Sequence, residues 1–82
     1  MRTAWKIVRG CSQGEFPTAE TARRVSDYLR HHAGLDEASP SIQILSRAMQ
    51  GVVTEERLRE RAAAEVDRLI AIAKAQLLRS VH

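Results

Sequence analysis

The chain has 82 residues, of which 44% are hydrophobic and 28% are charged, and its formal net charge at pH 7 is +3. This length is too short for two cores, and the composition is that of a folded rather than a disordered chain, so we expect a single helical domain over residues 1–82. Cys11 is the only cysteine, which excludes an intramolecular disulfide and a disulfide-stapled secreted fold.

The first segment, residues 3–9, admits two interpretations. Its residue types favour a strand. Its apolar residues also recur at helical spacing, at Ala4, Ile7, Val8 and Cys11. A lone strand would need a mate from a second copy or a partner, whereas a short helix would satisfy its own backbone. A loop is expected from Gly10 to Pro17.

Two helices are predicted next. Residues 18–33 place apolar and charged side chains on opposite sides of a helix, with Thr18 as the N-cap and Gly34 as the left-handed residue after the last turn. Pro40 has the φ angle of a first helical residue, so a second helix is expected over residues 40–50.

A long amphipathic helix is predicted over residues 54–79. Thr54 is its expected N-cap, and Val53 is expected to fold back onto Leu58 as a hydrophobic staple. One face of this helix is apolar along its whole length, through Leu58, Ala62, Val66, Leu69, Ile70, Ala73, Leu77 and Val81.

The second half of this helix, residues 69–78, is apolar nearly all round and keeps only Lys74 as a charged residue. Small residues also align with a leucine on the other side of the helix, at Ala64, Ala71, Ala75 and Leu78. A helix that is apolar on all sides must be buried on all sides, and two short neighbours cannot cover it. The sequence therefore predicts a dimer interface formed by Val66, Leu69, Ile70, Ala73, Leu77 and Leu78.

The fold class that follows is all-α, or mostly α with one short N-terminal strand. We expect a small three-helix domain whose long C-terminal helix packs in a homodimeric bundle.

The residues typical of catalytic or metal sites do not form a recognisable pattern. His31 and His32 are adjacent and point about 100° apart, which prevents them from sharing one metal ion, and His82 lies at the end of the chain. Cys11 is expected in a polar loop near Arg9, with no base assigned to it. The acidic residues of the long helix are expected to form a solvated face with neighbouring arginines, at Glu55, Glu56, Glu60, Glu65 and Asp67.

Nucleic-acid binding is the alternative function, through a basic face formed by Arg23, Arg24 and Arg30. A helix-turn-helix overlay fits poorly, because Arg47 occupies a position that should be small. A ribbon-helix-helix arrangement would explain a lone strand, but neither face of residues 3–9 is polar enough to read bases.

We therefore expect a small, non-enzymatic, cytoplasmic regulatory or adaptor protein that acts by protein–protein interaction. A second copy and a protein partner are expected ahead of nucleic acid. No membrane association, small-molecule substrate, metal or cofactor is expected.

Overall fold

The computed structural model describes residues 2–80, and within that range it contains four helices and no strand. The helices are α1 (Arg2–Ser12), α2 (Ala19–His32), α3 (Pro40–Met49) and α4 (Glu56–Ser80). The mostly helical fold class is confirmed. The expectation of three helices is wrong by one, because the N-terminal segment is also helical.

Residues 3–9 form part of helix α1, so the strand interpretation of this segment is wrong and the helical one is confirmed. The buried residues of α1 are Ala4, Val8 and Cys11, which recur every three to four positions and therefore share one face. A strand would have turned Val8 and Ile7 to opposite sides and left its backbone groups without partners. The helix also runs three residues further than expected, so Cys11 belongs to α1 and not to a loop.

The ends of α2 and the start of α3 follow local sequence signals. Thr18 precedes α2, and its side-chain oxygen accepts a hydrogen bond from the backbone N–H of Thr21 at 3.3 Å. After α2, Gly34 adopts a φ of +68°, as predicted for a residue that closes a helix. Pro40 occupies the first turn of α3, also as predicted.

The start of α4 differs from the expectation. Thr54 is buried, but its hydroxyl oxygen has no hydrogen-bond partner among the described residues, so it does not cap the helix. Val53 is 88% exposed and therefore does not pack on Leu58. The helix begins at Glu56, and the carbonyl oxygen of Glu55 accepts its first backbone hydrogen bond, from Arg59.

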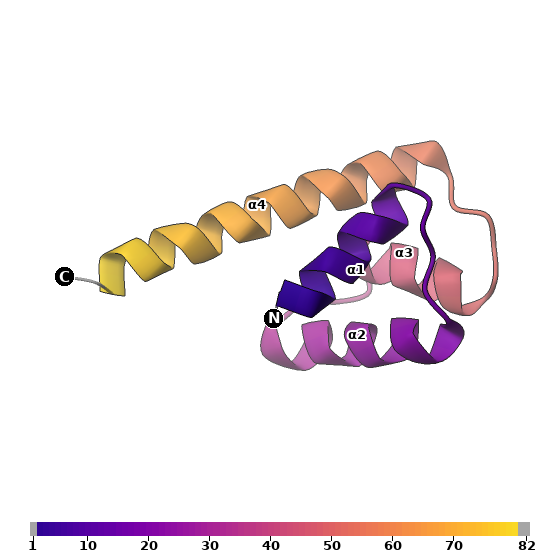
Figure 1. Ribbon diagram of the computed structural model, residues 1–82, viewed down its shortest axis with the longest axis horizontal. Coiled ribbons are helices and arrows are strands. Elements are labelled where there is room, and N and C mark those ends of the chain that lie inside the picture. The colour runs from indigo at the N-terminus through magenta and orange to yellow at the C-terminus, as the bar shows by residue number, and fades with distance from the viewer. Residues whose placement is uncertain (1, 81–82) are drawn as a thin grey trace.

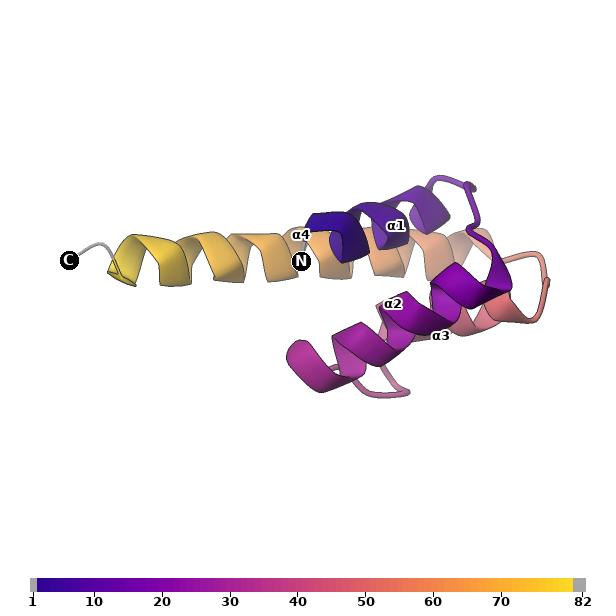
Figure 2. The ribbon, with the colours of Figure 1, turned by 60° about the horizontal axis from the view of Figure 1, so that its bottom comes forward.

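Helix α3 lies at the centre of the packing and contacts α1, α2 and α4 (Figures 1 and 2). Three of its apolar side chains, Ile42, Ile44 and Leu45, are completely buried. Helix α1 runs antiparallel to α4, since Ser12 lies against Arg59 and Arg9 lies against Asp67. These contacts build a compact body from α1, α2, α3 and the first half of α4.

The second half of α4 projects from this body (Figure 1). The molecule is 45 Å long but only 23 × 20 Å in cross-section for this reason. Helix α1 begins beside the middle of α4, so α4 continues past the point at which α1 could cover it.

Candidate functional site

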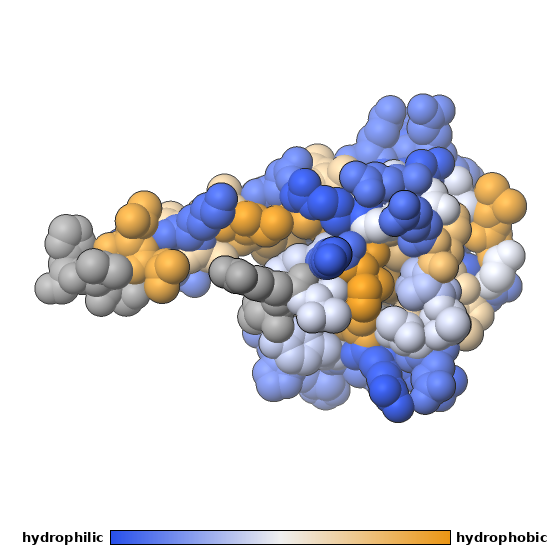
Figure 3. All heavy atoms as spheres, in the orientation of Figure 1, coloured by the Kyte–Doolittle hydropathy of each residue, from blue (hydrophilic) through white to orange (hydrophobic). Residues whose placement is uncertain are grey.

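The projecting part of α4, residues 71–80, is the most prominent surface feature, and we call it the α4 extension. Every residue from 71 to 79 is exposed, including Ile72 (44%), Leu77 (66%) and Leu78 (70%). Lys74 and Arg79 are its only charged residues. Figure 3 shows apolar side chains along this arm. Exposed apolar surface that is continuous along a helix is typical of an interaction site.

The structure separates the six predicted interface residues into three groups. Val66 is completely buried and belongs to the core of the body. Leu69 and Ile70 are half-buried where α4 leaves the body, and Ile70 packs against the core. Ala73, Leu77 and Leu78 are exposed on the extension. Periodicity placed these residues on one helix, but it could not show where the body stops covering them.

A cleft opens at the base of the extension, between α1 and α4. It is lined by Trp5, Lys6, Arg9 and Ile70 and has a volume of about 310 Å³. Trp5 and Ile70 supply its apolar part, and Lys6 and Arg9 make its rim basic. The sequence alone did not predict this cleft, because residues 65 positions apart in the chain form its apolar lining.

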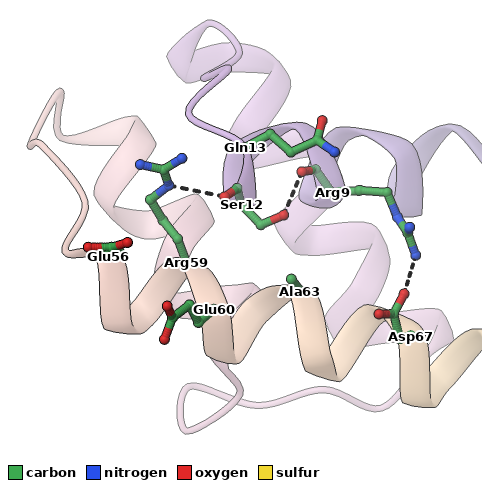
Figure 4. Close-up of a pocket in the computed structure, with 8 residues that line it drawn as sticks. All are labelled: Arg9, Ser12, Gln13, Glu56, Arg59, Glu60, Ala63 and Asp67. Carbon is green, nitrogen blue, oxygen red and sulfur yellow. Dashed lines mark hydrogen bonds and ion pairs between the residues drawn. The ribbon is translucent and has the colours of Figure 1, made fainter.

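A second cleft, more polar, lies further along the same pair of helices and has a volume of about 290 Å³ (Figure 4). Its arginines hold α1 to α4. The Nε of Arg59 donates to the carbonyl oxygen of Ser12 at 3.1 Å, and Arg9 forms an ion pair with Asp67. The Ser12 hydroxyl donates to the carbonyl oxygen of Arg9 at 2.6 Å. The first two of these contacts join α1 to α4 and the third lies within α1, so the polar groups of this cleft hold the two helices together.

Glu65 is buried, which contradicts its expected place on a solvated face. Its carboxylate accepts hydrogen bonds from the Ser39 hydroxyl at 2.7 and 2.8 Å and from the backbone N–H of Ser41 at 2.7 Å. It therefore caps the N-terminus of α3, where a negative charge is favoured. Its position three residues after Ala62 was the available signal, because that spacing turns it toward the body.

Cys11 is completely buried among apolar side chains of the core. Burial raises the pKa of its thiol to about 11, and a hydrogen bond to the backbone offsets only part of this effect. The expectation that Cys11 lies in a polar loop is therefore wrong. A protonated, inaccessible thiol is a poor nucleophile at neutral pH.

The buried thiol predicts a loss of stability in alkali. Between its usual pKa near 9 and its folded pKa near 11, Cys11 ionises in the unfolded chain but not in the folded one. The unfolding free energy should therefore fall as pH rises through this range, by about 2–3 kcal/mol in total. Urea unfolding of the wild type and Cys11→Ala at pH 8.5 and 10.5 measures the difference. Equal pH dependence in both proteins would contradict the assignment.

The histidines of α2 are exposed, and the ring of His32 lies 4.6 Å from that of Tyr28 between centroids. Across residues 2–80, no three His, Cys, Asp or Glu side chains come together in a way that could hold a metal ion. His82 and Val81 lie outside the described residues.

Two of the three arginines of the predicted nucleic-acid face are engaged by carboxylates. Arg24 pairs with Glu20 at 3.0 Å. Arg30 pairs with Asp27 at 3.4 Å and with Glu37 at 2.6 Å. Arg23 is exposed and forms no ion pair with a described residue. A phosphate would therefore have to compete with carboxylates for two of the three cations.

The loops before α2 and after α3 lie at the opposite end of the molecule from the extension (Figure 1), and they carry a second apolar cluster. Exposed Phe16, Val52 and Val53 meet Pro17 and Ala48 around a cleft of about 310 Å³. The sequence alone did not predict this cluster, because its members come from the loop before α2, the end of α3 and the loop after α3, which only the fold brings together.

The comparisons with known proteins give no relative from which a function could be inferred. No protein-family model, curated protein or solved structure matches the chain. None of the helices within residues 2–80 combines the length and hydropathy needed to cross a membrane. The function is therefore inferred from the chain's own surfaces.

Proposed function

We propose that this protein is a non-enzymatic regulatory or adaptor protein that acts through protein–protein contacts and self-associates through the α4 extension. The exposure of every residue from 71 to 79 carries this proposal. An isolated helix of about ten residues is only marginally stable in water. Packing its apolar side chains against another helix would stabilise it by removing apolar surface from solvent.

The face of α4 that contacts the body supplies the surface for the second copy. Ile70, Ala73 and Leu77 lie within about 60° of one another around the helix and continue the line of buried Val66. The dimer would extend the core past the end of the body, with Leu69 and Leu78 at the edges of the contact. The exposed face of α2 would remain available to a protein partner.

The test is sedimentation equilibrium of the wild type and of Ala73→Glu/Leu77→Glu. Both positions are exposed, so the body should stay folded, whereas two carboxylates per copy in an apolar contact should make the protein monomeric. The wild type is expected to be dimeric at micromolar concentration. A wild type that stays monomeric at high micromolar concentration would refute the proposal.

The matched control is Ile72→Glu/Ala75→Glu. It places the same two charges in the same exposed segment, but on the side of the helix away from Ile70. This variant should still dimerise. If it dissociates while Ala73→Glu/Leu77→Glu does not, the contact uses the small-residue side of the helix and the proposed face is wrong.

Salt distinguishes this proposal from nucleic-acid binding. An apolar contact should persist or strengthen as salt rises, whereas binding to duplex DNA or RNA should weaken with a slope near one per phosphate contact. Tight binding of duplex DNA or RNA with that slope, lost in Arg23→Glu, would favour the basic face instead.

A further inference from the structure

We propose that the two copies pack antiparallel, with the tip of each α4 extension seated in the cleft lined by Trp5, Lys6, Arg9 and Ile70 of the other copy. This inference rests on the proposed self-association and specifies its geometry. It assigns a role to the cleft at the base of the extension and identifies its occupant as Leu77 of the second copy.

The body excludes a parallel arrangement. The face of α4 that carries Ile70, Ala73 and Leu77 is the same face that the body covers up to residue 70. A parallel second helix on this face would bring its own body into the space occupied by the first (Figure 2). An antiparallel helix meets the extension and, at its tip, the start of α1, and the two bodies then lie at opposite ends of the contact.

The extension alone offers too little surface for a stable dimer, so we expect the cleft to form part of the interface. Ten helical residues span about 15 Å, so the extension offers fewer than about three turns of contact to a neighbouring helix. A stable interface buries about 800 Å² on each partner. Contact between the two extensions alone therefore falls well short, and the nearest apolar surface that can be added is the cleft with Trp5 and Ile70.

The spacing along α4 lets both copies make this contact at once. Leu77 lies about 10 Å further along the helix than Ile70 and on the same face. If Leu77 of one copy is opposite Ile70 of the other, the two-fold axis passes between positions 73 and 74, and the reciprocal pair forms automatically. Ala73 lies at the crossing point, where its small side chain allows the helices to approach closely.

Charge favours the same arrangement. The last carbonyl groups of a helix carry partial negative charge, and the tip of α4 would arrive at the basic rim of the cleft. Arg9 already pairs with Asp67, but Lys6 is exposed and forms no ion pair with a described residue. Arg79 lies about 180° around the helix from Ile70 and points away from this rim.

Trp5 reports on this contact directly, because it is the only tryptophan in the chain and lines the cleft. Its fluorescence emission should shift to shorter wavelength as the protein is concentrated. The concentration at the midpoint of this shift should equal the midpoint of dimerisation measured by sedimentation equilibrium. Quenching by acrylamide should fall about twofold on dimerisation, since the side chain of Leu77 would cover the exposed part of the ring.

Three variants complete the experiment. Leu77→Ala should lose both the dimer and the shift in emission. Ile72→Ala, on the other side of the helix, should keep both. Lys6→Gln should weaken dimerisation by about two- to fivefold while leaving the shift in the dimer intact.

A dimer whose Trp5 emission does not change with concentration would overturn the seating of the tip in the cleft but leave the proposed function standing. A protein that stays monomeric at every concentration measured, with constant Trp5 emission, would overturn both the seating of the tip and the proposed self-association.

Discussion

Glu65→Ala is expected to lower the unfolding free energy by about 3 kcal/mol. The substitution removes the acceptor of two donors, and it leaves the backbone N–H of Ser41 and the hydroxyl of Ser39 buried without a partner. It also removes the negative charge from the N-terminus of α3, the helix that contacts the other three. Urea unfolding followed by circular dichroism measures the effect.

The matched control is Glu60→Ala, which removes an exposed carboxylate from the same helix and should change stability by less than about 0.5 kcal/mol. Glu65→Gln should lie between the two, because its amide keeps one acceptor oxygen but turns an N–H donor toward one of its partners. All three substitutions should be measured in the Ala73→Glu/Leu77→Glu variant, so that dimerisation does not add to the measured unfolding free energy. Equal effects of Glu65→Ala and Glu60→Ala would show that Glu65 does not hold α3.

Leu45→Ala is expected to lower the unfolding free energy by about 3 kcal/mol, through lost burial and the cavity left behind. Leu45 is completely buried on α3, in the core shared by the four helices. The same urea titration measures this loss. Because two-state unfolding of so small a domain is cooperative, the loss should appear at once in all four helices.

Leu77→Ala is the control for this prediction, because it makes the same substitution at a leucine that is 66% exposed. It should leave the stability of the monomer within about 0.5 kcal/mol of the wild type and should act on self-association instead. A large loss of monomer stability in Leu77→Ala would mean that the tip of α4 contacts the body, and would contradict the description of the extension as an interaction surface.

The sequence by itself determined the helical class and most of the boundaries. Thr18, Gly34 and Pro40 act through their own backbone and immediate neighbours, so their effects could be predicted from the residues alone. The apolar nature of residues 69–78 was also evident from composition. Local chemistry and helical periodicity are properties of a short stretch of chain, and they do not depend on the rest of the fold.

Only the tertiary structure decided which surfaces are covered. Val66, Ile70 and Leu77 belong to one periodic pattern, yet Val66 is buried, Ile70 is half-buried beside a cleft and Leu77 is exposed, because the cover that the body gives to α4 ends after residue 70. Glu65 became a buried cap rather than a solvated charge because α3 begins beside it. Burial depends on contacts between residues far apart in the sequence, and the cleft at the base of the extension exists only where the start of α1 meets the middle of α4.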